Sequence, residues 1–198
     1  MERRYIKARV RVVEIMVSIP KLIFVSLLAA CMPALAQSAS DLMWPQHPKL
    51  TWDDFKGEPP EHVAFPSALS DTGFKFQLMC HNGMLDVDAH AFFTPTGSWV
   101  KPDEKTAELL KHEQGHFDMA EEYALRLRKA IREGRTSCED RARANAAGQR
   151  MVVEFQKDWE DAERQYEQDT RDGTDLARQD AASSRIAADL AALRADQP

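Results

Sequence analysis

The stretch "LLKHEQGHFDMAEEYA", residues 109–124, places two histidines four residues apart, with a glutamate directly after the first. It contains no proline and a single glycine, Gly115, and its Leu, Ala, Glu and Met content predicts an α-helix. On a helix, residues four apart lie on the same face. His112 and His116 can therefore reach one metal ion from one face, with Glu113 beside them.

The helical pattern extends through the rest of the chain. A first helix is expected from Pro102 to about Arg132, ending at Gly134, because proline suits a first turn and glycine commonly follows a last one. Two more helices are expected at residues 138–168 and 176–193. The apolar stripe of the first helix includes both histidines, which therefore point to the protein interior. This stripe consists of Leu109, His112, His116, Met119, Ala120, Tyr123 and Leu127.

The region before these helices predicts strands and turns. In "GFKFQLMCHNGMLDVDAHAFF", residues 73–93, apolar and polar residues alternate on both sides of Asn82-Gly83. That dipeptide between alternating segments is the strongest short signal for a β-hairpin. The chain is thus expected to be α+β, with a small antiparallel sheet from the N-terminal half packed against a bundle of about three helices. The domain would span residues 50–196, after a polar leader at residues 37–49.

The first 36 residues are typical of an export signal. They hold six Lys/Arg against two Asp/Glu, and they end in the apolar run "LIFVSLLAACMPALA", which is too short to span a bilayer. Ala34-Leu35-Ala36 places small residues at the positions that a signal peptidase reads. Residues 1–36 are therefore expected to be removed, with the mature chain beginning near Gln37 in the periplasm or outside the cell.

Two alternatives concern the same segment. Met16 could be the true start, because the sequence from there onward already contains a complete short signal. The tetrapeptide "LAAC", residues 28–31, also resembles a lipobox. In that case the protein would be a lipoprotein anchored to a membrane through lipidated Cys31.

Charge and cysteine content restrict the partners and the compartment. Without residues 1–36 the chain keeps 20 basic and 30 acidic residues, a formal net charge of −10, so nucleic acid is not an expected partner. Two cysteines remain, Cys80 and Cys138. An even number of cysteines in an oxidising compartment predicts a disulfide between them.

The His-Glu-x-x-His pattern is that of zinc hydrolases. Zinc prefers neutral imidazole nitrogens, and a catalytic zinc site uses three protein ligands and keeps one position open. The ion lowers the pKa of water, and Glu113 would take the proton and pass it to a leaving amine. His112 and His116 are thus expected as Zn2+ ligands and Glu113 as the general base, on a zincin-like helix.

A third ligand is missing from this helix. Asp118, Glu121 and Glu122 point away from the histidines by the helical period and are expected on a solvated face. The other histidines are expected at the surface. Carboxylates cluster instead between the last two helices, in "YEQDTRDGTD" at residues 166–175, and this turn is the best remaining source of a ligand.

Several segments resemble an uncharacterised bacterial family of predicted secreted zinc-dependent proteases, long known only as a domain of unknown function. The resemblance covers about residues 50–190. It is carried by "HEQGHFDMAE" at the metal helix, by "LTWDDFKG" at the family's opening Trp-x-Asp-Phe motif, and by "GSWV" just before the metal helix. "YEQDTRDG" matches the closing Tyr-Asp-x-x-Thr-x-His-Gly motif at Tyr166, Thr170 and Gly173, with Asp172 in the place of the family's histidine.

The resemblance implies that Asp172 supplies the third ligand, since zinc accepts carboxylate oxygen. The expected function is hydrolysis of a peptide or protein substrate by a secreted or periplasmic zinc metalloprotease. The alternative is a non-catalytic periplasmic binding or assembly protein with a degenerate or structural zinc site. Tyr166 could donate a hydrogen bond to an oxyanion or simply pack as an aromatic residue.

Overall fold

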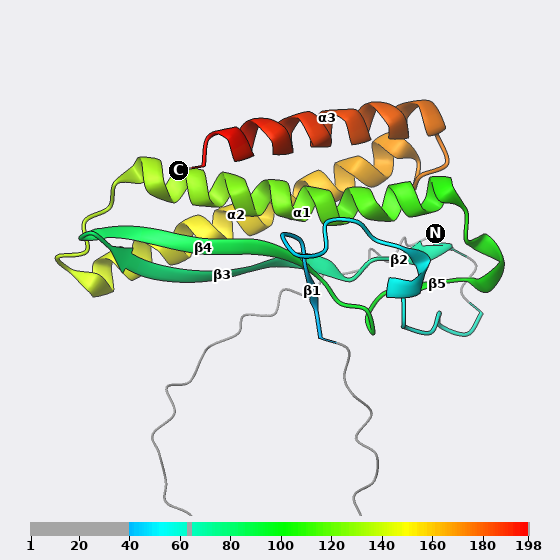
Figure 1. Cartoon of the computed structure of the whole chain (residues 1–198), viewed down its shortest axis with the longest axis horizontal. Helices are drawn as coiled ribbons and strands as arrows, with labels where there is room; N and C mark the ends of the chain where they lie inside the picture. Colours follow the sequence, from blue (N-terminus) through cyan, green and yellow to red (C-terminus); the bar gives the residue numbers. More distant parts are fainter. Residues whose placement is uncertain (1–39, 63–64, 198) are drawn as a thin grey trace, which may run out of the picture.

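The computed structural model describes residues 40–62 and 65–197 of the chain (Figure 1). The expected export signal at residues 1–36, with Cys31 and the cleavage site, lies outside these described residues. Two small antiparallel sheets are present. The larger has the strand order β1-β4-β3, and the smaller pairs β2 (Ala68–Leu69) with β5 (Trp99–Val100).

The long hairpin of the larger sheet is formed by β3 (Thr72–His81) and β4 (Met84–Phe93). Asn82 and Gly83 make its turn with φ of 50° and 76°, and His81 pairs with Met84. Positive φ at both central residues is the geometry that Asn-Gly favours, so the predicted hairpin is confirmed. Strand β1 (Leu42–Met43) pairs with the other edge of β4.

Three long helices follow the strands. Helix α1 (Ala107–Gly134) begins where the Thr106 side chain accepts a hydrogen bond from the Leu109 N–H. The expected earlier start at Pro102 is a separate 3-10 turn, η2 (Pro102–Glu104), and another such turn, η1, covers Trp52–Asp54. Helices α2 (Arg141–Thr170) and α3 (Leu176–Ala195) are capped by Asp140 and Asp175.

Helix α1 occupies the centre of the molecule. In Figure 1 the hairpin lies beneath α1, α3 lies above it, and α2 runs alongside, and α1 contacts all of them. Phe93 of β4 packs against Phe117 of α1 with ring centroids 6.0 Å apart, and Phe74 of β3 meets Trp159 of α2 at the same separation. The predicted α+β class, a small antiparallel sheet against three helices, is confirmed.

Two expectations about the surface are wrong. Glu121 and Glu122 are not on a solvated face, because both side chains are buried between α1 and the neighbouring elements. Glu121 accepts the Ala91 N–H of β4 at 2.7 Å, and Glu122 faces Arg126 and Arg185. Asp118 is half-buried and accepts a hydrogen bond from Trp44.

The segment expected as a polar leader also takes part in the domain. From residue 40 onward it supplies β1 and the buried Trp44, whose ring lies 3.8 Å beneath the guanidinium of Arg194 at the end of α3. Burial of the apolar residue Trp44 and partial burial of Leu42 and Met43 favour packing of this segment despite the polar residues around them. The folded region therefore begins before Leu50.

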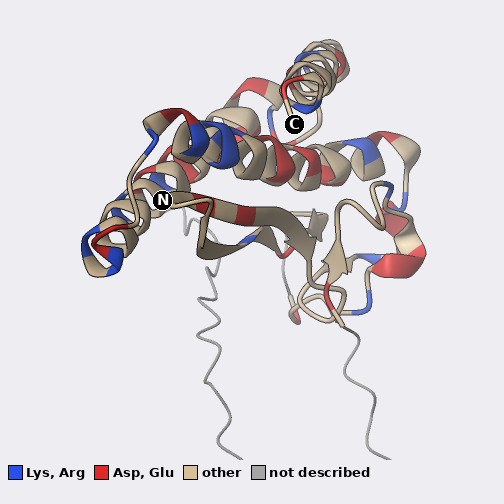
Figure 2. Cartoon of the chain, turned by 60° about the vertical axis from the view of Figure 1, so that its left-hand side comes forward, with Lys and Arg blue, Asp and Glu red and all other residues tan. Residues whose placement is uncertain are grey.

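The predicted disulfide is confirmed, because Cys80 at the end of β3 is bonded to Cys138 between α1 and α2. The hairpin end is joined to the same linker by hydrogen bonds, from Leu85 N–H to Thr136 O and from Cys138 N–H to Gly83 O. Such a bond indicates an oxidising compartment and thus a non-cytoplasmic protein. Figure 2 shows the charged residues spread mainly along the helices, and within the described ranges no helix has the length and apolarity to cross a membrane.

Replacing both Cys80 and Cys138 by serine is expected to lower the free energy of unfolding by about 2–5 kcal/mol, because the cross-link limits the unfolded chain. Denaturant titration of the double variant against the oxidised parent measures this loss. Reduction of the parent should give a similar loss. An unchanged midpoint in both experiments would show that the bond contributes little to stability.

Candidate metal centre

The two histidines of the sequence pattern lie side by side on α1. His112 is 3% exposed and His116 is 7% exposed, and their Nε2 atoms are 3.3 Å apart. The intervening turn of helix brings both rings to the side that faces α2. As the sequence predicts, two imidazole nitrogens thus point to one position in the interior.

A carboxylate from α2 completes this group. Glu167 has one oxygen 3.4 Å from His112 Nε2 and the other 3.2 Å from His116 Nε2. Within the described ranges, His112, His116 and Glu167 form a group whose three ligand atoms lie within 4.8 Å of one another. The Glu167 side chain is 38% exposed, so the group is open to solvent on the α2 side.

The remaining nitrogen of each ring has its own hydrogen-bond partner. His112 Nδ1 lies 2.9 Å from Oε1 of Gln179, a buried residue of α3. His116 Nδ1 lies 2.5 Å from Oε2 of Glu163, whose other oxygen accepts the Trp159 indole N–H. A hydrogen bond at Nδ1 fixes the ring orientation and leaves Nε2 as the metal-facing atom.

The carboxylates and the imidazoles of the group stabilise each other's charged forms. Burial alone would raise the pKa of Glu167, but hydrogen bonds and charge interactions with the two imidazoles hold it well below the usual range. Burial likewise would lower the pKa of His116, yet Glu163 and then Glu167 raise it well above its ordinary value. Without an ion, the carboxylates therefore favour a positive charge at the position that the ring nitrogens face.

Glu113 lies beside this group rather than within it. Its side chain is buried, and the hydroxyl of Ser70, between β2 and β3, donates a hydrogen bond of 2.6 Å to Oε2. Burial raises the pKa of Glu113, against the opposing charges of His116 and His112. A carboxylate with a raised pKa next to a metal position is suited to accept and return a proton.

Tyr166 holds His112 from the side of α2. The two rings are stacked with centroids 4.9 Å apart, and the Tyr166 hydroxyl donates to the His112 carbonyl at 3.0 Å. The contact is close because Gly115 has no side chain: a Cβ there would overlap the hydroxyl. Of the two sequence-based interpretations of Tyr166, this geometry favours packing, since the hydroxyl is already engaged in the interior.

The turn after α2 closes over the same histidine. Gly173 has φ of 78°, and a Cβ there would lie 2.8 Å from His112 Cγ. The Thr170 hydroxyl donates to the Tyr166 carbonyl and accepts the Gly173 N–H, which fixes this turn. Tyr166, Thr170 and Gly173, the residues that match the closing motif, thus all shape the surroundings of His112.

Gly115→Ala is expected to destabilise the protein, even though alanine favours a helix over glycine by about 1 kcal/mol. Displacing Tyr166 should cost about 1–3 kcal/mol of unfolding free energy, because the buried ring has no free space. Thermal unfolding measures the balance. Gly134→Ala, at the end of the same helix, is the matched control, since its Cβ would meet nothing within 4 Å. Equal stability of the two variants would contradict the expected overlap.

Asp172, the residue expected as third ligand, is placed differently. It lies in the turn after α2 with φ of 57°, and the group around the histidines contains Glu167 in its stead. Sequence reasoning also missed Glu163 and Gln179. Glu163 and Glu167 are one helical turn apart on either side of the buried Tyr166, and this spacing was a usable signal. No local sequence pattern distinguishes Gln179 from the other polar residues of α3.

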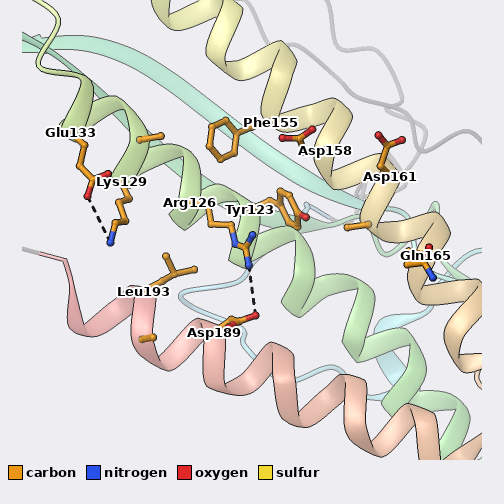
Figure 3. Close-up of a pocket in the computed structure, with 13 residues that line it drawn as sticks. Tyr123, Arg126, Lys129, Glu133, Phe155, Asp158, Asp161, Gln165, Asp189 and Leu193 are labelled. Atoms are coloured by element: carbon orange, nitrogen blue, oxygen red, sulfur yellow. Dashed lines mark ion pairs between the residues drawn. The ribbon is translucent and has the colours of Figure 1, made fainter.

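A separate groove of about 900 Å³ lies farther along the three helices (Figure 3). Tyr123 and Arg126 of α1 project into it between Phe155 of α2 and Leu193 of α3. Its charged side chains are partly paired with one another, as in Arg126 with Asp189 and Lys129 with Glu133. It contains neither histidine, so the metal centre is a distinct site.

Comparison with known proteins relates part of the chain to a bacterial family. A model of a family described as bacterial proteins of unknown function (DUF922) matches residues 96–173. This segment, less than half of the chain, includes α1, α2 and the turn at Gly173, and hence all three members of the metal-binding group. Searches of curated proteins and of solved structures found no match. The chain is therefore similar to an uncharacterised bacterial family, whose description states no activity.

Proposed function

We propose that the protein is a zinc-dependent peptidase in which His112, His116 and Glu167 hold the ion and Glu113 is the general base. The observation that carries the proposal is the convergence of two Nε2 atoms and a carboxylate at mutual distances of 3.2–3.4 Å. Ligands about 2.0–2.1 Å from a tetrahedral zinc ion stand about 3.3 Å apart. The donor set therefore fits zinc both in chemistry and in spacing.

Two features of the site support an open coordination position. Three protein ligands and an exposed side at Glu167 are typical of a catalytic site, whereas a structural site is closed by four ligands. Glu167 now takes the role that the sequence-based hypothesis gave to Asp172. Both are carboxylates, so the expected chemistry of the ligand set is unchanged.

A zinc ion held there would lower the pKa of a water molecule and polarise the carbonyl of the scissile bond. Glu113 would accept a proton from that water and deliver it to the leaving amine. Ser70 keeps Glu113 in position through its hydrogen bond to Oε2. Glu163 and Gln179 each place an oxygen within hydrogen-bond distance of a histidine Nδ1 and would accept a proton there, which would leave both Nε2 atoms free to bind.

Metal content and cleavage of a peptide library by the purified chain test this proposal. The zinc-loaded protein is expected to cleave library members, and a chelator should abolish cleavage that added zinc restores. Zinc binding without cleavage of any member would favour the alternative, a non-catalytic protein with a degenerate or structural zinc site. Absence of zinc binding would refute both.

We also propose that the protein acts outside the cytoplasm after removal of residues 1–36. The disulfide and the basic, apolar start of the chain support this proposal. Mass spectrometry of the protein from the cell envelope is expected to show an N-terminus near Gln37. A lipidated Cys31 would instead identify a membrane-anchored lipoprotein, and an intact Met1 or Met16 would contradict export.

A further inference from the structure

Gln179 links the third helix to the metal centre. It is 1% exposed, and its amide has three neighbours: His112 Nδ1 at 2.9 Å, the Tyr166 hydroxyl at 2.6 Å and the Ser183 hydroxyl at 3.1 Å. In a buried amide, the NH2 group needs an acceptor and the oxygen needs a donor, because an unpaired buried polar group destabilises the fold and no water is there to pair with it. The positions of its protons can therefore be deduced.

The deduction begins at a group that cannot donate. The backbone carbonyl of His112 only accepts, so the Tyr166 hydroxyl, 3.0 Å away, must direct its single proton there. The hydroxyl can then only accept from Gln179, which places the NH2 end of the amide towards Tyr166. The amide oxygen consequently faces His112 Nδ1, and this nitrogen must carry the ring proton.

We propose that Gln179 is a positioning residue that sets the tautomer of His112 before any metal arrives. The lone pair of His112 is then fixed at Nε2, the atom 3.3 Å from His116 Nε2 and 3.4 Å from Glu167. The chain of hydrogen bonds begins and ends at His112 and passes through all three helices. The inference rests on the zinc site proposed above, and it adds α3, which lies beyond the matched residues 96–173, to that site.

The chemistry of the residue explains why an amide suits this place. His116 is oriented by a carboxylate, Glu163, and two more carboxylates are close by: Glu167 within the group and the buried Glu113 beside it. An amide accepts the Nδ1 proton of His112 without a fourth negative charge in the interior. It also donates to Tyr166, which a carboxylate could not do.

The test compares Gln179→Met, Gln179→Glu and Ser183→Ala in the whole, disulfide-bonded chain. Methionine is similar in length but accepts no strong hydrogen bond, glutamate retains the acceptor, and Ser183→Ala removes a neighbour of the amide that does not contact His112. Nitrogen NMR of the His112 ring in the metal-free protein, at mildly alkaline pH, reports which nitrogen is protonated. Competition with a chelator gives the zinc dissociation constant.

The parent, Gln179→Glu and Ser183→Ala are expected to carry the proton at Nδ1. Gln179→Met should shift the proton towards Nε2 and weaken zinc binding about 10–100-fold. A folded Gln179→Met protein with the parental tautomer and affinity would overturn the inference. Should this variant fail to fold, a proton at Nε2 in the parent or in Gln179→Glu would overturn it equally. A parent that binds no zinc would refute the proposed function, while the NMR result would still decide the role of Gln179.

Discussion

Glu113→Gln is expected to reduce peptide hydrolysis about 10²–10⁴-fold, the range for loss of a general base, while the zinc content stays at that of the parent. The amide has nearly the shape of the carboxylate and can still accept from Ser70, but it cannot take a proton from water. Rates under single-turnover conditions and metal analysis of the same samples measure both quantities.

The control is Glu108→Gln, which makes the same chemical change at an exposed position in the first turn of α1. It should leave both hydrolysis and zinc content unchanged. Loss of zinc together with activity in Glu113→Gln would mean that Glu113 is itself a ligand. Full activity without the carboxylate would remove it from the mechanism.

Glu167→Ala is expected to weaken zinc binding by more than about 100-fold, beyond the effect of losing an outer hydrogen-bond partner. The variant leaves two imidazoles, and it removes the only carboxylate of the group that touches both Nε2 atoms. Competition with a chelator measures the dissociation constant. Hydrolysis at saturating zinc should fall as well, because the open position is no longer defined.

Asp172→Ala is the matched control for this experiment, since it removes a carboxylate five residues later in the same closing motif. Asp172 has interactions of its own in the structure, so the stability of this variant is to be measured separately. Its zinc affinity should stay close to that of the parent. Equal weakening by the two variants would place a ligand in the turn, as the family resemblance implies, and would require the turn to move when metal binds.

Those features of the molecule that depend on neighbouring residues were predictable from the sequence. Asn82-Gly83 sets the hairpin because both residues tolerate positive φ, and the spacing of apolar residues gives three helices. His112, Glu113 and His116 lie within two turns of one helix, so the sequence already predicts that the two histidines share one face with Glu113 beside them. The disulfide was predictable because Cys80 and Cys138 are the only cysteines in the sequence after residues 1–36, the segment expected to be an export signal.

Only the tertiary structure decided which side chains contact the histidines and the acidic residues of α1. Helix α1 packs against the sheet and against both other helices, and Glu121 and Glu122 are buried even though the helical period places them away from the histidines. Whether Glu167 or Asp172 lies next to the two histidines depends on the position of α2 along α1. Close contacts between residues far apart in sequence restrict that position: Tyr166 of α2 fits against Gly115 of α1, and Gly148 of α2 fits against Leu78 and Leu85 of the hairpin. Gln179 reaches His112 for the same reason: packing of distant helices, and no local pattern, brings the two together.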